Sequence, residues 1–136
     1  MRKNRIKPDI YAPNGVAIGG YDPVSYFLDH QAAVGSSAYR THWGGAEWHF
    51  VNADHKNMFD KSPESYAPQY GGYCSFGVGL GDKAHSSPKA WSIVDGKLYL
   101  NQTTAVNKIW RATRFLMVPA AEHNWPKLIQ AKKTDQ

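Results

Sequence analysis

The sequence contains a single cysteine, Cys74, among its 136 residues. One cysteine cannot form an internal disulfide, so cysteine usage does not indicate a redox compartment. The sequence also lacks a long apolar run, and we therefore expect no transmembrane helix. The N terminus begins with basic residues but lacks the apolar segment that completes a secretory signal. We expect a periplasmic location if an export signal was removed, and a cytoplasmic one otherwise.

Excess charge is absent from the middle of the chain. The formal net charge is +5, but the first nine and last ten residues hold seven basic and two acidic side chains, which account for all of it. Between residues 10 and 126, nine basic and nine acidic side chains cancel. Because the pattern shows no basic face within the fold, we expect no specific binding of nucleic acid.

The length and the 42% hydrophobic content are sufficient for one domain with a real core. Five tryptophans indicate that a few large side chains carry much of the packing. No internal repeat or linker divides the chain. We predict a basic N-terminal tail over residues 1–14, one domain over residues 15–130 and a disordered C-terminal tail over residues 131–136.

Two β-hairpins are predicted, so the fold class is α+β. Residues 39–50 alternate around Gly44-Gly45, which places Trp43, Trp48 and Phe50 on the core face. The same alternation turns His42, Glu47 and His49 outward, and the simplest interpretation of His49 is a solvated strand histidine. The second hairpin, residues 91–100, turns at Asp95-Gly96, a dipeptide that favours a type I′ turn.

Helix starts are predicted where a capping residue precedes a proline or an apolar pattern. They lie at Asp22-Pro23, with Val24, Phe27 and Leu28 buried, at Asn52 for residues 53–61, at Ser62-Pro63, at Thr103 or Thr104, and at Pro119. The helix after Thr104 should bury Val106, Ile109 and Trp110 with Phe115 or Met117, and Pro126 should interrupt the last helix. Residues 15–20 are predicted as a short strand that ends in a turn.

The segment Tyr66–Ser75 is rich in tyrosine and glycine and contains the single cysteine. It holds three tyrosines, the pair Gly71-Gly72 and Cys74 within ten residues. Gly71-Gly72 permit backbone angles that are closed to other residues, so this turn can bring Cys74 close to another segment or to a ligand. The glycines at positions 77, 79 and 81 indicate that any helix after Cys74 is short.

The chain has one cysteine and six histidines, which are side chains able to ligate a soft or borderline metal ion. No Cys-x-x-Cys, His-Glu-x-x-His or His-x-His motif is present, so spacing does not single out a ligand set. A lone cysteine is also often a small buried apolar side chain. No local pattern supplies the base that a nucleophilic cysteine needs.

Several motifs in order resemble the YHS-domain family. They are Tyr21-Asp22-Pro23-Val24, Trp43-x-Gly45, Phe50 through Phe59 to Tyr66, the segment Ala67–Cys74, and Trp91 to Asn101. The last two are similar to the longer bacterial branch of the family, and the resemblance covers roughly residues 15 to 128. It implies a small domain with a treble-clef-like core, related to metal-binding modules.

The resemblance also implies where a metal site would lie. Shorter family members bind soft metals through three cysteines, whose positions here are occupied by Ser25, Val51 and His55. Two of these side chains are not metal ligands. His55 remains able to ligate, and Cys74 is a cysteine that the short members do not supply.

We therefore predict a non-catalytic YHS-type module that binds copper or zinc, in metal handling or sensing. The candidate ligands are Cys74, His55, His49 and His85. The alternative is a metal-free domain that binds a ligand or a protein partner through Tyr66, Tyr70, Tyr73 and the tryptophans around the Gly-Gly-Tyr-Cys turn. A third interpretation makes Cys74 a redox thiol.

Overall fold

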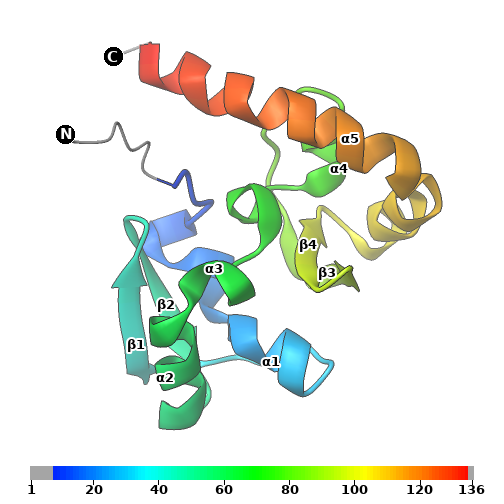
Figure 1. The fold of residues 1–136 in the computed structure, drawn as a ribbon. Helices are drawn as coiled ribbons and strands as arrows, with labels where there is room; N and C mark the ends of the chain where they lie inside the picture. Colours follow the sequence, from blue (N-terminus) through cyan, green and yellow to red (C-terminus); the bar gives the residue numbers. More distant parts are fainter. Residues whose placement is uncertain (1–7, 135–136) are drawn as a thin grey trace.

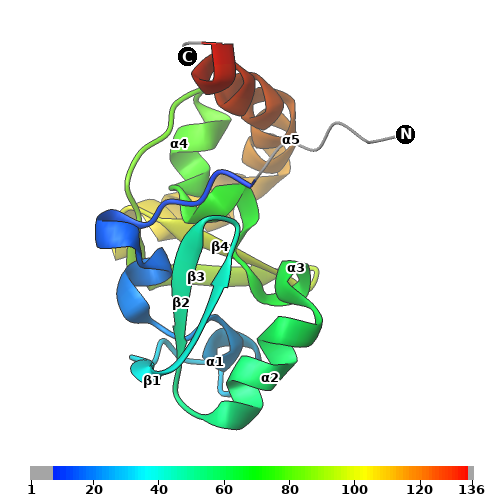
Figure 2. The ribbon, with the colours of Figure 1, turned by 90° about the vertical axis from the view of Figure 1, so that its left-hand side faces the viewer.

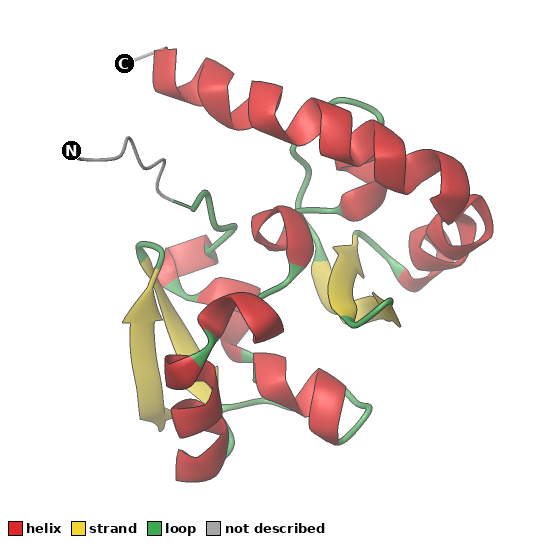
Figure 3. Ribbon diagram, in the orientation of Figure 1, coloured by secondary structure: helices red, strands yellow, loops and turns green. Residues whose placement is uncertain are grey.

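The computed structural model describes residues 8–134 and has the predicted α+β architecture (Figures 1 and 3). The elements in chain order are α1 (Pro23–Leu28), β1 (Ser36–Trp43), β2 (Ala46–Phe50), α2 (Ala53–Lys61), α3 (Pro63–Tyr66), α4 (Ser75–Gly79), β3 (Ser87–Val94), β4 (Lys97–Asn101) and α5 (Thr104–Thr134). The strands form two separate antiparallel hairpins, β1–β2 and β3–β4. Figure 2 shows α4 and α5 at one end of the molecule and α2 at the other, with the hairpins between them.

Both predicted hairpins are confirmed, together with their turns. Gly44 and Gly45 have φ of 64° and 82°, and Asp95 and Gly96 have φ of 52° and 75°. Two successive positive φ values are what a type I′ turn requires. Trp48 and Phe50 are fully buried and Trp43 is partly buried against the same cluster, as the alternation predicted.

Two of the predicted helix caps are confirmed by hydrogen bonds from backbone amides to the capping side chains. Asp22 Oδ1 accepts from the amides of Val24 and Ser25, so α1 begins at Pro23. Asn52 Oδ1 accepts from the amide of His55, so α2 begins at Ala53. These caps satisfy amide groups that have no partner within the helix.

The core consists of two clusters that meet at the β3–β4 hairpin. Leu98 and Leu100 belong to the first cluster, with Trp48, Phe50 and Phe59. Tyr99, between them on β4, belongs to the second cluster with Trp110. Because successive strand residues point to opposite faces, β4 joins both clusters. This hairpin holds the two halves of the domain together.

The prediction that Pro119 begins a last helix and that Pro126 interrupts it was wrong. Helix α5 continues as one helix through Pro119 and Pro126 to Thr134. Proline removes one amide and crowds the preceding turn, which bends a helix without ending it where tertiary packing is sufficient. Met117 and Ala121 flank Pro119 and are buried, and Figure 1 shows α5 changing direction along its length. Residues 131–134 of the predicted tail lie in this helix, and residues 135–136 lie outside the described part.

Three expectations of burial or strand structure were wrong. Residues 15–20 form no strand, because Ile18 and Gly19 have φ of 54° and 57° and lie in 3₁₀ turns. Leu28 is 48% exposed because α1 ends there. In α5 Ile109 is 51% exposed, whereas Trp110 and Met117 are buried as predicted and Phe115, the alternative to Met117, is 81% exposed.

The chain before residue 15 is packed where the structure describes it. Ile10 and Ala12 pack against the first cluster, and the amide of Tyr11 donates to the carbonyl of Gly71 over 2.9 Å. Asp9 forms an ion pair with Lys83 over 2.6 Å. The predicted boundary at residue 15 therefore falls inside the packed region, while residues 1–7 lie outside the described part.

Candidate functional site

Cys74 is buried, with 3% of its surface exposed, at the residue before α4. Its amide donates to the carbonyl of Ala84 over 3.0 Å. Its thiol donates to Oδ1 of Asn101 over 3.6 Å. The Gly71-Gly72 turn does bring Cys74 against another segment, but the neighbour of the sulfur is an amide side chain.

Asn101 connects Cys74 to a buried polar network. Its Oδ1 also accepts from the amide of Phe76, and its Nδ2 donates to Oδ1 of Asn107 over 3.0 Å. Asn107 accepts from Ser92 Oγ and donates to the carbonyl of Trp91. Because buried polar groups are costly without partners, this network stabilises the contact between β3, β4 and α5. Cys74 is a member of a structural network.

His55 is buried and lies 2.8 Å from Asp22, through Nδ1 and Oδ2. The same Oδ2 accepts from the amide of Val51 over 2.8 Å. Asp22, which is 0% exposed, therefore holds the start of α1, the end of β2 and α2 at one carboxylate. An ionised carboxylate can accept this many hydrogen bonds.

His49 pairs with Glu47 on the outer side of β2, with 2.6 Å between Nε2 and Oε2. His42, opposite Glu47 in the register, lies 3.4 Å from Oε1 of the same carboxylate. The hydrogen bond from His49 is the main cause that lowers the pKa of Glu47, against a smaller opposing effect of desolvation. His49 is less solvated than predicted, because Val16 bridges to Glu47 and Gly20 lies beside its ring.

His85 is exposed, and its ring lies 3.2 Å from the amide nitrogen of Gln102. It follows Ala84, whose carbonyl binds the amide of Cys74, so its backbone is close to the cysteine. Its side chain contacts Gln102, however, whereas the thiol contacts Asn101.

The four predicted metal ligands thus have four different partners. They are Asn101 for Cys74, Asp22 for His55, Glu47 for His49 and Gln102 for His85. Among the residues that the structure describes, no three histidine, cysteine, aspartate or glutamate side chains are arranged to hold a metal ion. No helix in that part is long and apolar enough to cross a membrane.

The three predicted ligand-binding tyrosines are used for internal packing. Tyr66 packs edge-on against Phe27, with 5.5 Å between the ring centres. Tyr70 is buried and donates to Glu122 over 2.9 Å, and desolvation with this bond raises its pKa. Tyr73 donates to Asp9, and desolvation, with the nearby Asp9 charge, raises its pKa to about 12.

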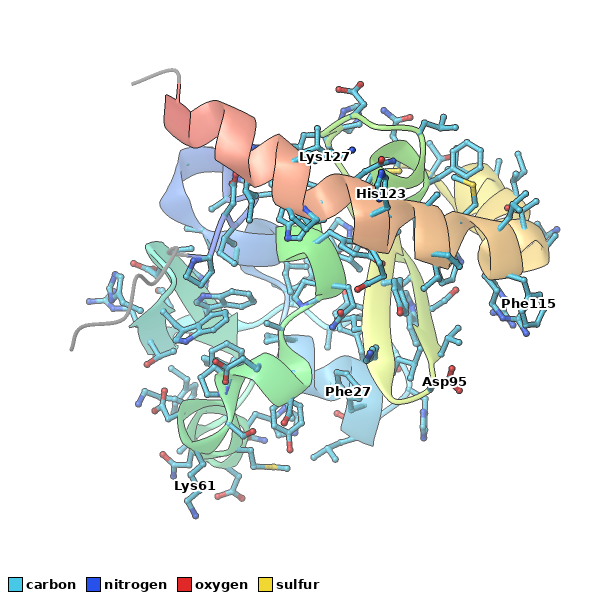
Figure 4. The ribbon with its side chains drawn as sticks, turned by 45° about the horizontal axis from the view of Figure 1, so that its top comes forward. Phe27, Lys61, Asp95, Phe115, His123 and Lys127 are labelled. Carbon is cyan, nitrogen blue, oxygen red and sulfur yellow. The ribbon has the colours of Figure 1, made fainter. Side chains whose placement is uncertain are left out.

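A hollow of about 440 Å³ lies between α1, β3 and α5, where sequence reasoning placed no site. Its lining residues are Phe27, His30, Trp91, Ser92, Ile93 and Arg111. Figures 1 and 2 show α1 lying below the β3–β4 hairpin, and Figure 4 labels Phe27 on α1. No sequence motif joins these three segments, so only folding brings them together.

The lining of the hollow combines aromatic and apolar side chains with one serine and two basic side chains. Trp91 and Ile93 alternate with Ser92 along β3 and present one face, and Trp91 also packs on Tyr26 with ring centres 5.2 Å apart. No lining residue is acidic. Among the described residues, no hydrogen bond or ion pair involves the guanidinium of Arg111. His30 contributes a second basic side chain from the left-handed position after α1, with φ of 52°.

Comparison with protein-family models, with curated proteins and with solved structures found no match to this chain.

Proposed function

We propose that this chain is a non-catalytic ligand-binding domain, and that the hollow between α1, β3 and α5 is its site. The observation that carries the proposal is the exposed guanidinium of Arg111, which has no hydrogen bond or ion pair with the residues that the structure describes, at a hollow lined by Phe27, Trp91 and Ile93. Ligand sites are typically concave and mostly apolar, with few polar groups and volumes of roughly 300–1,000 Å³. This proposal is a form of the metal-free alternative that we predicted. It keeps one of the tryptophans, Trp91, but not Tyr66, Tyr70 or Tyr73.

The lining indicates the class of ligand. A guanidinium binds carboxylates through two parallel hydrogen bonds, and it is always charged. The indole of Trp91 and the ring of Phe27 offer flat apolar surfaces for an aromatic or aliphatic body. The ligand that fits this combination is a small organic carboxylate with an aromatic body.

The test compares an aromatic carboxylate, indole-3-acetate, with its neutral amide, indole-3-acetamide, by NMR titration of the labelled protein. We expect the carboxylate to shift the signals of Trp91 and Phe27 and to bind about tenfold or more tightly than the amide, a difference of about 1.4 kcal/mol. Arg111→Gln should remove this preference. Arg114→Gln, which changes an arginine outside the hollow, is the matched control and should keep it. Equal binding by Arg111→Gln and the wild type would exclude the site.

The resemblance to the YHS-domain family and its treble-clef-like core remain predictions, and one feature supports them. The positions aligned with the metal-binding cysteines of short members all bond to Asp22, Ser25 and Val51 through their backbone amides and His55 through Nδ1. The three positions therefore lie around one carboxylate.

Binding of copper or zinc through Cys74 remains a prediction that needs a rearrangement of the Asn101 network. Titration of Cu(I) and Zn(II) into the wild type and Cys74→Ala tests it. A difference in affinity of about tenfold or more would establish Cys74 as a ligand. Equal weak binding would remove it from any site, and neither result would change the carboxylate test.

A further inference from the structure

One surface of α5 is apolar although it faces solvent. Ile109, Phe115 and Leu116 are 51%, 81% and 72% exposed, and Leu80, which ends α4 beside α5, is 68% exposed. We call Ile109, Phe115 and Leu116 the α5 outer face. In the described residues the other exposed large hydrophobic side chains are Leu28, Val34, Tyr39 and Leu80.

The helix is apolar on two sides. Trp110, Met117 and Ala121 are buried in the second core cluster. Ile109 and Leu116, two turns apart, each precede a buried residue and so lie about 100° around the helix from it, at the flank of the buried face. Figure 4 shows Phe115 projecting away from the helix at the edge of the molecule. Because a surface helix normally turns polar residues outward, this second apolar side needs a partner to cover it.

The charge beside the outer face has one sign. Residues 104–121 contain Lys108, Arg111 and Arg114 and no acidic residue. The guanidinium of Arg114 lies 4.6 Å from the ring centre of Phe115, so a basic group and the most exposed aromatic are adjacent. A partner that complements this face is therefore apolar and negatively charged.

We propose that the α5 outer face binds the surface of an anionic lipid membrane. Phe115 and Leu116 enter the boundary between head groups and acyl chains, and Lys108 and Arg114 contact the lipid phosphates. A membrane accepts side chains that project from a convex helix, and it combines apolar material with negative charge. The inference does not depend on the carboxylate site, because none of these four side chains lines the hollow.

Sedimentation with vesicles tests the proposal. One set contains only phosphatidylcholine, and the other contains equal parts of phosphatidylcholine and phosphatidylglycerol. We expect the wild type to bind the anionic vesicles about tenfold or more tightly than the neutral ones, with an affinity that falls as salt is added. The double variant Phe115→Ser/Leu116→Ser should lose this binding, and Lys108→Gln/Arg114→Gln should weaken it and reduce its salt dependence.

The matched control is Val34→Ser, which changes an apolar side chain that is 67% exposed but distant in sequence from α5. It should bind as the wild type does. The substituted positions are exposed except Arg114, which is half-buried, and circular dichroism checks that each variant is folded. Unchanged vesicle binding by the Phe115→Ser/Leu116→Ser variant would overturn the proposal, as would equal binding to both vesicle types. Dimerisation that depends on Phe115 and Leu116, without vesicle binding, would assign the face to a second copy of the chain.

Discussion

The buried carboxylate of Asp22 connects α1, the end of β2 and α2. It caps α1 through Oδ1, and it binds Val51 and His55 through Oδ2. A buried carboxylate with this many donors is stable only while every donor stays in place. Asparagine at this position would keep one accepting oxygen and replace the other oxygen with an NH₂ group, which donates hydrogen bonds.

We therefore predict that Asp22→Asn lowers the free energy of unfolding by about 2–3 kcal/mol, the value of hydrogen bonds to a charged group. Denaturant unfolding at neutral pH measures the change. Asp54→Asn, an exposed position in the first turn of α2, is the control and should cost about 0.5 kcal/mol through the helix dipole. Similar losses in both variants would show that Asp22 does not hold the three segments together.

Glu47 gives the protein a pH dependence with a defined sign. The hydrogen bond from His49 lowers the pKa of Glu47 in the folded state. A lowered pKa contributes stability above the unfolded pKa, roughly 4.3, and this contribution is lost as the pH falls through the folded pKa. The wild type should therefore lose stability relative to Glu47→Gln between about pH 5 and pH 3.

Denaturant unfolding at successive pH values checks this prediction. Glu64→Gln, in α3, replaces an exposed carboxylate and serves as the control. A difference between the wild type and Glu47→Gln that stays constant over this range would show that the contact with His49 does not affect the pKa of Glu47.

At the scale of elements, the Gly71-Gly72 turn fastens the N-terminal segment to the body of the domain. Gly71 has φ of 64°, and its carbonyl accepts the amide of Tyr11. A Cβ at this position would overlap the carbonyl oxygen of Asp9. Glycine is required here for two reasons, the positive φ and the close approach of the N-terminal segment at Asp9.

Gly71→Ala should therefore be more destabilising than a substitution that strains the backbone alone. Gly96→Ala is the matched control, since Gly96 has φ of 75° and open space around its Cβ position. We expect Gly96→Ala to cost about 1–2 kcal/mol and Gly71→Ala about 1–3 kcal/mol more, measured by denaturant unfolding. Equal losses of unfolding free energy in the two variants would mean that residues 9–11 can move away from position 71 without destabilising the protein.

At the scale of the whole molecule, buried tyrosines connect the two halves of the chain. Tyr26 donates to the carbonyl of Pro88, and Tyr70 donates to Glu122. Desolvation raises the pKa of Tyr26, Tyr70, Tyr73 and Tyr99. A raised pKa contributes stability below the unfolded pKa, roughly 10, and this stability is lost as the pH rises through the folded pKa.

We predict alkaline unfolding in which phenolate absorbance and loss of circular dichroism rise together above about pH 10. Tyr70→Phe should cost about 1 kcal/mol at neutral pH, through the bond to Glu122, but should lose less stability than the wild type above pH 10. Tyr39→Phe, at a side chain that is 39% exposed, is the control and should follow the wild type. Phenolate that forms fully before unfolding would contradict the burial of these rings.

Local chemistry by itself determined the two hairpins and the caps at Asp22 and Asn52, because turns and helix starts depend on neighbouring residues. Tertiary structure alone decided that Cys74 faces Asn101, that His55 faces Asp22, and that Arg111 lines the same hollow as Trp91 and Phe27. It also decided that α5 continues through Pro119, because burial of Met117 and Ala121 outweighs a local preference. Contacts between distant segments depend on the packing of the whole core, which no local pattern contains.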